Sequence, residues 1–396
     1  MNLELKVQSP ARVHEQIECF LREQILAGEL KVGEQLPATH VLARRWRVDH
    51  TAIQKAMTQL VERGLIVRRR RLGTFVNPAR CAIAVLTGPS LTDETAHFHR
   101  AVVKCLQMEI AGSKDDCWEC RVYGGVTEPQ TGGDFSPAFV CRQFLNDLRY
   151  YSFKGIVQLA GTLNEQSFSG EESQKLERLP VARMASQVRQ TGADVALDFY
   201  RFTKESVCFA AEHGFGKVAY LRTLYDSAAT ARDLDGLHDA VKSLGLPKAQ
   251  VCQLEEVWMT GCQLERMAYE KTLKLVDAWR TEKSWPETLL VSDDIAARGV
   301  ALALVRRGVE VVMIGEKRGA VHADGTDLPE KFGLITAANE TVEHHYGLPV
   351  TRYEFSPQTV ARELIRVLRD QLSGKTSSRQ SPGSLGEGWI SGKIKI

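Results

Sequence analysis

The stretch LPATHVLARRWRVDHTAIQKAMTQLVERGLIVRRRRLGTFV, residues 36–76, decides the fold of the N-terminal part of the chain. Its apolar spacing predicts a helix, a tight turn at Arg47, a second helix, and two short strands around a basic loop. Asp49 is expected to cap the second helix, because its carboxylate can accept a hydrogen bond from a first-turn backbone N–H. Gly64 stands just past the end of that helix, where a left-handed backbone favours glycine.

The second helix is predicted to have one buried face and one polar face. Ile53, Met57, Leu60 and Val61 recur with helical spacing and indicate the buried side. The other side carries residues that reach base edges or phosphates and contribute little to a core. These residues are His50, Thr51, Gln54, Lys55 and Thr58.

Four consecutive arginines, residues 68–71, follow on the loop between the two strands. A charge run alone is usually a solvated surface, so a small helical domain with a basic loop is the alternative. Its coincidence with a helix-turn-helix pattern favours a winged helix-turn-helix that binds duplex DNA. The candidate DNA contacts are Thr39, His40, His50, Thr51, Gln54, Lys55, Arg69, Arg70, Arg71, Gly73 and Thr74.

Residues 12–76 resemble the DNA-binding domain of GntR-family bacterial transcription regulators. The matching segments include residues 25–30, 36–37, 62–66 and 73–76. In that family, the positions of His40, His50 and Gln54 often carry arginines that contact bases or phosphates. These departures remove fixed positive charge, so the resemblance does not carry over an operator sequence.

The composition is that of an ordinary globular protein, with 396 residues, 43% of them hydrophobic and 25% charged. This length predicts two or three domains. The net charge is +2, but residues 1–80, where DNA binding is predicted, hold 14 Lys and Arg against 8 Asp and Glu, whereas the remainder holds 37 against 41. No stretch of about 18 apolar residues occurs, and the N-terminus lacks the apolar core of a signal peptide. We therefore expect a cytoplasmic protein that does not span a membrane.

The nine cysteines form no disulfide or metal framework. Cys117 and Cys120 have the spacing of a redox or zinc motif, but no second pair or matching histidines accompany them. The dipeptide His344-His345 is interpreted as a surface pair. No metal and no cofactor are therefore expected.

From about residue 79 onward, apolar segments alternate with amphipathic helical segments, which predicts parallel sheets flanked by helices. Predicted strands include residues 218–221, 289–291 and 311–314. The fold class is α/β, with a winged helix-turn-helix followed by a two-lobed domain of two parallel sheets. A ligand cleft is expected at the carboxyl ends of the strands. The predicted domains are 1–78 for DNA binding, 79–374 for effector binding and 375–396 as a flexible tail.

Residues 81–373 resemble the effector domain of LacI-type regulators, which is itself similar to periplasmic sugar-binding proteins. The matching pieces are Asp198 with the helix after it, residues 212–221, residues 292–301 and residues 311–316. The resemblance implies that Asp294 accepts hydrogen bonds from ligand hydroxyls, although Asp293 or Asp294 can instead cap the following helix. The ligand-binding candidates are Asp294, Asp198, Arg183 and Glu316.

Several positions depart from the pattern of the LacI-type family. Asp233 stands where an arginine that clamps the ligand is common, and Glu316 replaces the usual aromatic residue. Ala185 and Ser186 stand where an Asp-Arg pair is expected, and Arg183 is the candidate to compensate. The two-lobed shape therefore carries over more safely than sugar binding does.

The leading hypothesis is a ligand-responsive transcriptional repressor that binds a palindromic DNA operator as a homodimer. Its effector is expected to be a small polar ligand, similar to a sugar, in the cleft between the lobes. One alternative is a constitutive DNA-binding protein whose second domain no longer binds a ligand. Another is an enzyme fused to a DNA-binding head, but no Schiff-base lysine motif, Gly-x-Ser-x-Gly, P-loop or His-Glu-x-x-His motif is present. The chain is therefore expected not to be an enzyme.

Overall fold

The computed structural model describes residues 12–31, 33–77, 81–87, 97–112, 118–124, 126–127, 138–140, 142–148, 153–159, 162–163, 170–185, 193–223, 232–254, 261–316, 329, 331–342, 344–374 and 389–395. None of the helices in these ranges combines the length and the apolar character that crossing a bilayer requires.

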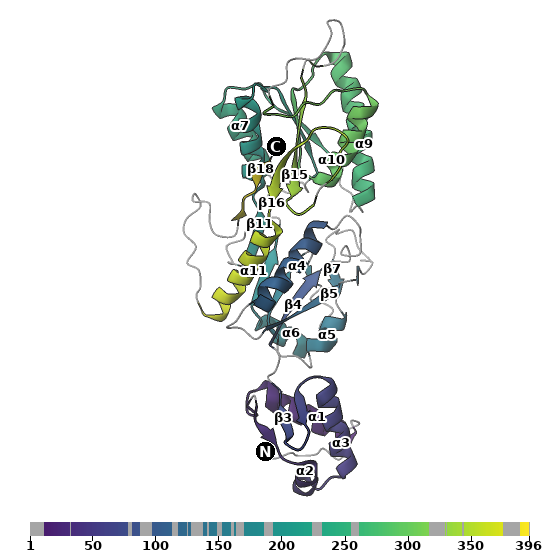
Figure 1. The fold of residues 1–396 in the computed structure, drawn as a ribbon, viewed down its shortest axis with the longest axis vertical. Helices are drawn as coiled ribbons and strands as arrows, with labels where there is room; N and C mark the ends of the chain where they lie inside the picture. The colour runs from purple at the N-terminus through teal and green to yellow at the C-terminus, as the bar shows by residue number, and fades with distance from the viewer. Residues whose placement is uncertain are drawn as a thin grey trace. The chain divides into compact units, whose positions relative to one another are not determined.

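The N-terminal domain is a three-helix unit with a three-stranded antiparallel sheet (Figure 1). Its elements are α1 (Val13–Leu26), β1 (Gln35–Leu36), α2 (Thr39–Trp46), α3 (His50–Glu62), β2 (Ile66–Arg69) and β3 (Gly73–Val76). The apolar faces of the helices and the strands share one core that includes Ile17, Leu42, Ile53 and Leu60. Buried Glu18 on α1 forms ion pairs with Arg22 and with Arg63, the residue that ends α3. The predicted winged helix-turn-helix is therefore confirmed.

The first large sheet has six strands in the order β17-β11-β10-β8-β4-β5. Its elements are β4 (Cys81–Thr87), α4 (His97–Gly112), β5 (Trp118–Gly124), α5 (Arg142–Leu148), β8 (Phe153–Gln158), α6 (Gly170–Glu177), β10 (Val181–Met184), β11 (Asp194–Leu197), α11 (Pro357–Leu372) and β17 (Trp389–Ile390). A small additional sheet joins β6 (Val126–Thr127), β7 (Ala138–Val140) and β9 (Thr162–Leu163). In the large sheet, β10, β11 and β17 run parallel.

The second large sheet has six strands in the order β13-β12-β14-β15-β16-β18. Its elements are α7 (Phe199–Glu212), β12 (Val218–Arg222), α8 (Arg232–Ser243), β13 (Gln250–Gln253), α9 (Gly261–Glu282), β14 (Thr288–Val291), α10 (Asp294–Arg306), β15 (Gly333–Asn339), β16 (Thr351–Phe355) and β18 (Lys393–Lys395). The first five strands are parallel, and β18 is antiparallel to β16.

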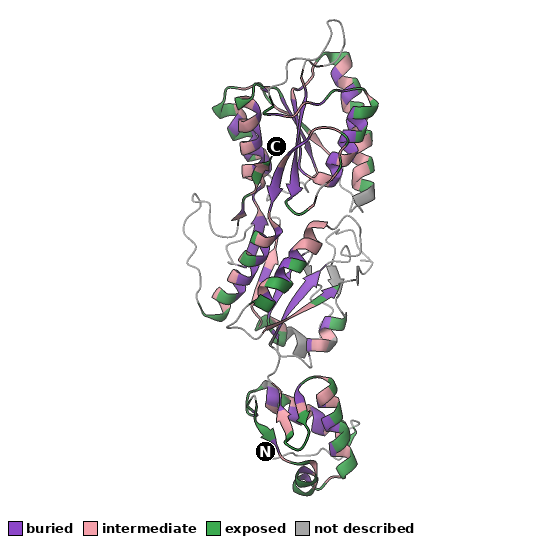
Figure 2. Cartoon of the chain, viewed as in Figure 1, coloured by how far each residue is buried: buried purple, intermediate pink, exposed green. Residues whose placement is uncertain are grey.

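Helices cover both faces of this second sheet (Figure 1). Along β12, Ala219 and Leu221 enter one apolar core, whereas Val218 and Tyr220 enter another. The first core contains residues of α9 and α10, and the second contains residues of α7 and α8. Because both faces are covered, the central strands β14 and β15 are buried along their whole length, as Figure 2 shows in purple. The predicted α/β class with two mostly parallel sheets is confirmed.

Two predictions about this part of the chain are wrong. Residues 311–314 form no strand, although Val312 donates a hydrogen bond to the carbonyl of Phe332. The flexible tail predicted over 375–396 is wrong for residues 389–395, which add β17 to the first sheet and β18 to the second. Main-chain pairing and the burial of Ile390 and Ile394 in apolar surroundings hold this segment in place. Residues 375–388 and 396 lie outside the described residues.

Candidate DNA-binding surface and effector site

The turn between α2 and α3 is built from two special backbone positions. Arg47 ends α2 in the left-handed region, with φ 54° and ψ 44°. Asp49 then caps α3 by accepting a hydrogen bond from the backbone N–H of Thr51 at 2.6 Å. The hydroxyl of Thr51 donates to the same carboxylate oxygen at 2.6 Å, and these bonds hold the pKa of Asp49 below its usual value. The predicted turn and cap are confirmed.

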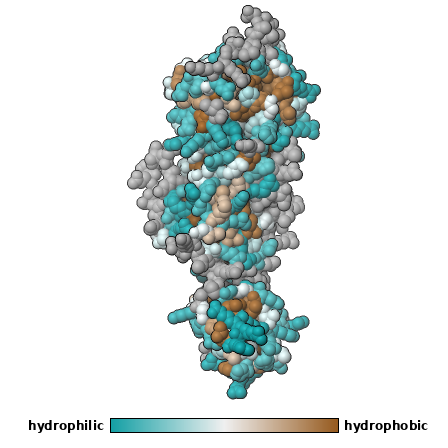
Figure 3. Space-filling view, viewed as in Figure 1, coloured by the Kyte–Doolittle hydropathy of each residue, from teal (hydrophilic) through white to brown (hydrophobic). Residues whose placement is uncertain are grey.

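Helix α3 presents the expected polar face to solvent. Ile53, Ala56, Met57 and Leu60 are buried against the domain core. The residues on the other face are all exposed: His50, Thr51, Gln54, Lys55 and Thr58. Figure 3 shows that the surface of this domain is largely hydrophilic on the face in view. A helix with this polar face has the dimensions and the chemistry to enter a major groove.

The arginine run lies on the hairpin of β2 and β3, which forms the wing. Arg68 and Arg69 belong to β2, whereas Arg70 and Arg71 belong to the turn, and all four are exposed. The carbonyl of Arg69 accepts a hydrogen bond from the N–H of Leu72 at 3.1 Å. Arg71 has a φ of 64°, a left-handed conformation that glycine adopts more easily. The turn therefore holds two cationic side chains at the tip of the wing.

Two side-chain hydrogen bonds position the wing. Arg68 donates to the hydroxyl of Thr58 at 3.4 Å, which ties β2 to the polar face of α3. The amide of Gln35 donates to the carbonyl of Leu72 at 2.8 Å, which ties β1 to the wing tip. Glycine suits position 73 because its φ is +116°, a conformation that L side chains rarely adopt, and a Cβ there would lie 2.6 Å from the Gln35 amide nitrogen and displace the end of that side chain. Gln35 is not among the residues predicted from the sequence, because 37 residues separate it from its partner.

The structure brings several of the predicted DNA-contact residues together. Thr39, the first residue of α2, is hydrogen-bonded to His50, the first residue of α3, with 3.0 Å between Oγ1 and Nε2. His40 is exposed beside Thr39. The guanidinium of Arg69 lies over the ring of Phe75, 5.3 Å from its centroid. Gly73 and Thr74 begin β3, opposite Arg69 and Arg68.

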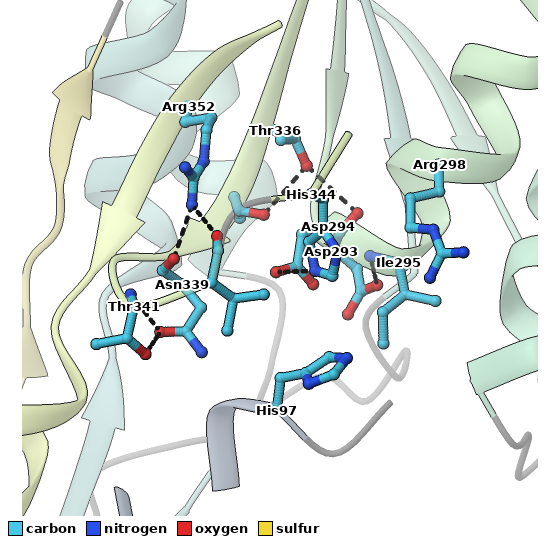
Figure 4. A network of polar contacts seen from close by, with 12 residues as sticks. His97, Asp293, Asp294, Ile295, Arg298, Thr336, Asn339, Thr341, His344 and Arg352 are labelled. Carbon is cyan, nitrogen blue, oxygen red and sulfur yellow. Dashed lines mark hydrogen bonds and ion pairs between the residues drawn. The ribbon is translucent and has the colours of Figure 1, made fainter. Parts of the chain in front are cut away.

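At the carboxyl end of β14, two adjacent aspartates take different roles (Figure 4). Asp293 caps α10 and accepts hydrogen bonds from the backbone N–H groups of Ile295 at 2.9 Å and Ala296 at 3.0 Å. Burial, and after it the charge of Asp294, raise the pKa of Asp293 to about 6. The capping alternative therefore applies to Asp293, and the side chain of Asp294 is directed toward His344.

Three residues outside the predicted set form a cluster with Asp294, which contacts His344 directly. The Nε2 of His344 lies 3.3 Å from an Asp294 carboxylate oxygen. The rings of His97 and Tyr346 have their centroids 5.6 Å and 6.0 Å from that of His344. The surface-pair interpretation is wrong for His344, whose side chain is only 8% exposed. The sequence contained both partners, Asp294 and His344, but they are far apart along the chain, so nothing in the sequence indicated that they are in contact.

The other three predicted ligand residues are engaged elsewhere. Asp198 is fully buried and caps α7 by accepting a hydrogen bond from the N–H of Arg201 at 3.2 Å. Arg183 donates to buried Asp194 at 2.8 Å. Glu316 is exposed beyond a tight turn. Asp294 alone among the four predicted residues lies in the cluster with His344.

Asp233, which departs from the family pattern, forms a buried ion pair with Arg222. The Nε and Nη2 atoms of Arg222 donate to the two carboxylate oxygens of Asp233 at 2.6 and 3.0 Å. The hydroxyl of Tyr220 donates to Asp233 at 2.8 Å. Asp233 and Arg222 are 0% and 1% exposed, so the pair is shielded from solvent. Where a ligand-clamping arginine is common in the family, this chain therefore has an aspartate that pairs with a residue of its own core.

The cysteine pair gives no sign of reactive chemistry at its described member. Burial, with a smaller effect from Glu119, raises the pKa of Cys120 to about 11. Its thiol therefore stays protonated at neutral pH. Cys117 and Ser186 lie outside the described residues.

Comparisons with known proteins assign each part of this structure to a class. Residues 13–76 match the family model of bacterial regulatory proteins, gntR family. The HTH-type transcriptional repressor NagR of Bacillus subtilis is 22% identical over 239 residues, which cover 58% of this chain and 90% of that protein. The probable fructoselysine utilization operon transcriptional repressor of Escherichia coli K12 is 33% identical over 122 residues, covering 28% and 50%.

The remainder of the chain matches solved structures by fold. A LacI family transcriptional regulator from Arthrobacter sp. FB24, solved in complex with lactose, superposes with a TM-score of 0.52 at 16% identity. The match covers 80% of this chain and 98% of that structure. The chain therefore joins a GntR-family DNA-binding domain to a domain of the LacI-type effector fold. It is a transcription regulator, as are the two relatives and the solved structure named above.

Proposed function

We propose that this protein is a ligand-responsive transcriptional repressor that binds a palindromic operator as a homodimer. The observation that carries the proposal is the exposed polar face of α3, to which Arg68 ties the cationic wing through Thr58. Relatives of this domain are themselves named repressors. Because a symmetric dimer matches a symmetric operator, two such heads read two half-sites. The site of action is then the cytoplasm, where the operator lies.

On the operator, the two parts of this surface have different tasks. Gln54 is suited to the N6 and N7 edge of adenine, and Thr51 to a thymine methyl group or a phosphate. Lys55 and the wing arginines are suited to phosphates, which set register and affinity without reading sequence. Base preference therefore depends on α3, and salt dependence depends chiefly on the wing.

The effector site of this proposal is the cluster of Asp294, His344, His97 and Tyr346. Asp294 follows a parallel strand at its carboxyl end, the edge at which α/β sheets bind ligands. Its side chain is 16% exposed, so a ligand can reach it while most of the carboxylate is enclosed. A small polar ligand that binds two conformations of the protein with different affinity shifts operator affinity by that difference.

A second candidate is a constitutive DNA-binding protein without an effector. The observation that favours it is the buried pair of Arg222 and Asp233, which leaves no ligand-clamping arginine at this position. A ligand that binds only the folded state raises the melting temperature, by an amount that follows from its concentration relative to Kd. Thermal shifts with a panel of sugars, sugar acids and nucleosides therefore separate the two functions.

Selection of binding sites from random duplexes tests the DNA-binding part of the proposal. The full chain should enrich an inverted repeat, with half-sites separated by a whole number of helical turns. Replacement of Gln54 by Ala should change the enriched bases at one symmetric pair of positions. Enrichment of no sequence, or a uniform loss at every site in the variant, would contradict base reading by α3.

A further inference from the structure

Leu72, at the tip of the wing, is an apolar side chain in an otherwise cationic turn. It is 62% exposed, the highest value among the exposed large hydrophobic residues of the described ranges. Single exposed leucines are ordinary on protein surfaces, so exposure alone carries no conclusion. The position is the unusual feature, because hairpin turns that face only water favour Gly, Asn, Asp and Ser. Such departures from local preference are expected where a segment serves a function.

Hydrogen bonds within the domain fix the backbone of the wing tip. The N–H of Leu72 donates to the carbonyl of Arg69 at 3.1 Å. The carbonyl of Leu72 accepts from the side-chain amide of Gln35 at 2.8 Å. Both backbone polar groups of Leu72 therefore have partners inside the domain, and its side chain is the part that is available to a binding partner. A tip held in this way loses little conformational entropy when it binds.

The charges beside Leu72 indicate the kind of partner that it meets. Arg70 and Arg71 are exposed in the same turn. The segment 66–76 contains four arginines and no Asp or Glu. An apolar side chain among cations fits a surface that combines negative charge with apolar faces. The minor groove of DNA is such a surface, because phosphates line it and stacked bases form its floor, and leucine is among the residues that proteins insert there between base steps.

The distance between α3 and the wing tip matches the distance between adjacent grooves. Arg68 donates to Thr58 on the polar face of α3 at 3.4 Å. A strand rises about 3.4 Å per residue, so the turn lies up to about 10 Å beyond this contact. A helix with its side chains has a radius of about 5–6 Å, which places the tip up to about 15 Å from the axis of α3. Neighbouring major and minor grooves are half a helical turn apart, about 17 Å, so the tip reaches the minor groove while α3 occupies the major groove.

We infer that Leu72 is an apolar wedge that enters the minor groove, separates two stacked base pairs and bends the operator. This inference rests on the proposed function and adds a deformation of the DNA to it. Arg70 and Arg71 contact the phosphates that border the groove and hold the wedge at its step. Pyrimidine–purine steps are the most easily kinked, so the operator has such a step at a fixed distance from the bases that α3 reads. Each head of the dimer carries one wedge, which places the kinks at two symmetric steps.

Fluorescence measurements on duplexes that carry the site selected from random sequences test the wedge. Donor and acceptor dyes at the two ends report the bend by energy transfer, with the full chain at saturating concentration. In a second set of duplexes, 2-aminopurine replaces one adenine at a time, because its fluorescence rises when it is unstacked. In a third set, a mismatch at the pyrimidine–purine step lowers the cost of unstacking before the protein binds. Leu72→Ala removes the wedge, Leu72→Met keeps an apolar one, and Leu244→Ala is the matched control, because it truncates an exposed leucine outside the DNA-binding domain.

The expected result is a bend of at least about 20° with the unsubstituted chain, Leu72→Met and Leu244→Ala, and a rise of 2-aminopurine fluorescence at one symmetric pair of steps. Leu72→Ala should lose that rise and at least half of the bend. The mismatch should raise the affinity of the unsubstituted chain at least about fivefold and leave that of Leu72→Ala unchanged.

A straight duplex, or a bend and a 2-aminopurine signal that are the same with Leu72→Ala, would overturn the wedge and leave the repressor function intact. A change of base preference in Leu72→Ala without a change in the bend would place Leu72 against a base edge and would also overturn the wedge. The absence of any selected site would refute the proposed DNA-binding function and the wedge with it.

Discussion

Arg71→Gly is expected to stabilise the wing and to weaken DNA binding at the same time. Arg71 has a φ of 64° at the tip of the hairpin. The left-handed conformation costs a non-glycine residue about 1–2 kcal/mol. Glycine removes that cost but loses about 0.5–1 kcal/mol through the greater entropy of the unfolded chain. The net change in the free energy of unfolding is therefore a gain between about 0 and 1.5 kcal/mol.

The same substitution removes one phosphate contact from each head of the proposed dimer. Each such contact contributes about 0.9 to the slope of log K against log salt, so the dimer's slope falls by about 1.8. Across a tenfold change in salt concentration, the affinity lost per head therefore changes about eightfold and is larger at the lower salt concentration. The loss should be similar on specific and random duplexes, because phosphates carry no sequence information.

Two matched variants separate the backbone effect from the charge effect. Arg71→Ala loses the same charge but keeps the backbone cost, and Arg70→Gly loses a charge at a residue whose φ is not positive. Fluorescence anisotropy over a salt series gives the slopes, and hydrogen exchange of peptides from residues 13–76 gives local stability. Faster exchange in Arg71→Gly than in Arg70→Gly, or an unchanged salt slope, would refute the reasoning.

Three further predictions concern α3 and the second sheet. Gln54→Ala should alter base preference, which selection of binding sites measures. Lys55→Ala should lower the affinity for all duplexes alike, which fluorescence anisotropy measures. Identical effects of the two substitutions would contradict the division of tasks between base reading and phosphate binding. Because burial raises the pKa of Asp293 to about 6, native protein binds more protons than unfolded protein between about pH 4 and 6, and stability falls as the pH rises through that window. Asp293→Asn keeps a capping oxygen but cannot titrate. Urea titrations should therefore show that its free energy of unfolding depends less on pH and is not lowered at pH 7.5. A decrease in stability equal to that of Asp293→Ala would be inconsistent with this account. Asp233→Asn leaves the buried Arg222 without a counter-charge. Calorimetry should therefore show a free energy of unfolding lower by about 3–5 kcal/mol. A decrease below about 1 kcal/mol would contradict this expectation.

Local signals explain why the N-terminal domain was predictable. The turn at Arg47, the cap at Asp49 and the glycine at Gly64 each depend on neighbours within a few residues. The amphipathic spacing of α3 identifies its buried side without reference to distant contacts. Contacts between distant residues, such as those of Gln35 with the wing tip and of Glu18 with Arg63, were not predicted, because nothing in the local pattern specifies them.

The later strands were harder to predict because their stability comes from tertiary pairing. Residues 333–339 contain glycine and alanine and have no clear strand pattern, whereas residues 351–355 alternate β-prone and charged residues, a pattern that predicts a half-exposed strand and not a buried one. Both are buried in the sheet, where Arg352 and Glu354 pair with each other. Polar residues that neutralise each other inside a sheet are invisible to a hydrophobic pattern. The contact between His97 and His344 was also not predicted, because these residues come together only in the folded chain.

In the proposed ligand-responsive regulator, the division of roles between Asp293 and Asp294 gives a ligand a route to affect DNA binding. Asp293 uses its carboxylate to fix the start of α10, which leaves Asp294 on a defined backbone but without a capping task. A hydrogen bond to a charged group contributes about 1.5–3 kcal/mol. Coupling energies between allosteric sites are about 1–3 kcal/mol. One ligand contact to Asp294, formed in only one conformation, is therefore enough for a tenfold or greater change in operator affinity.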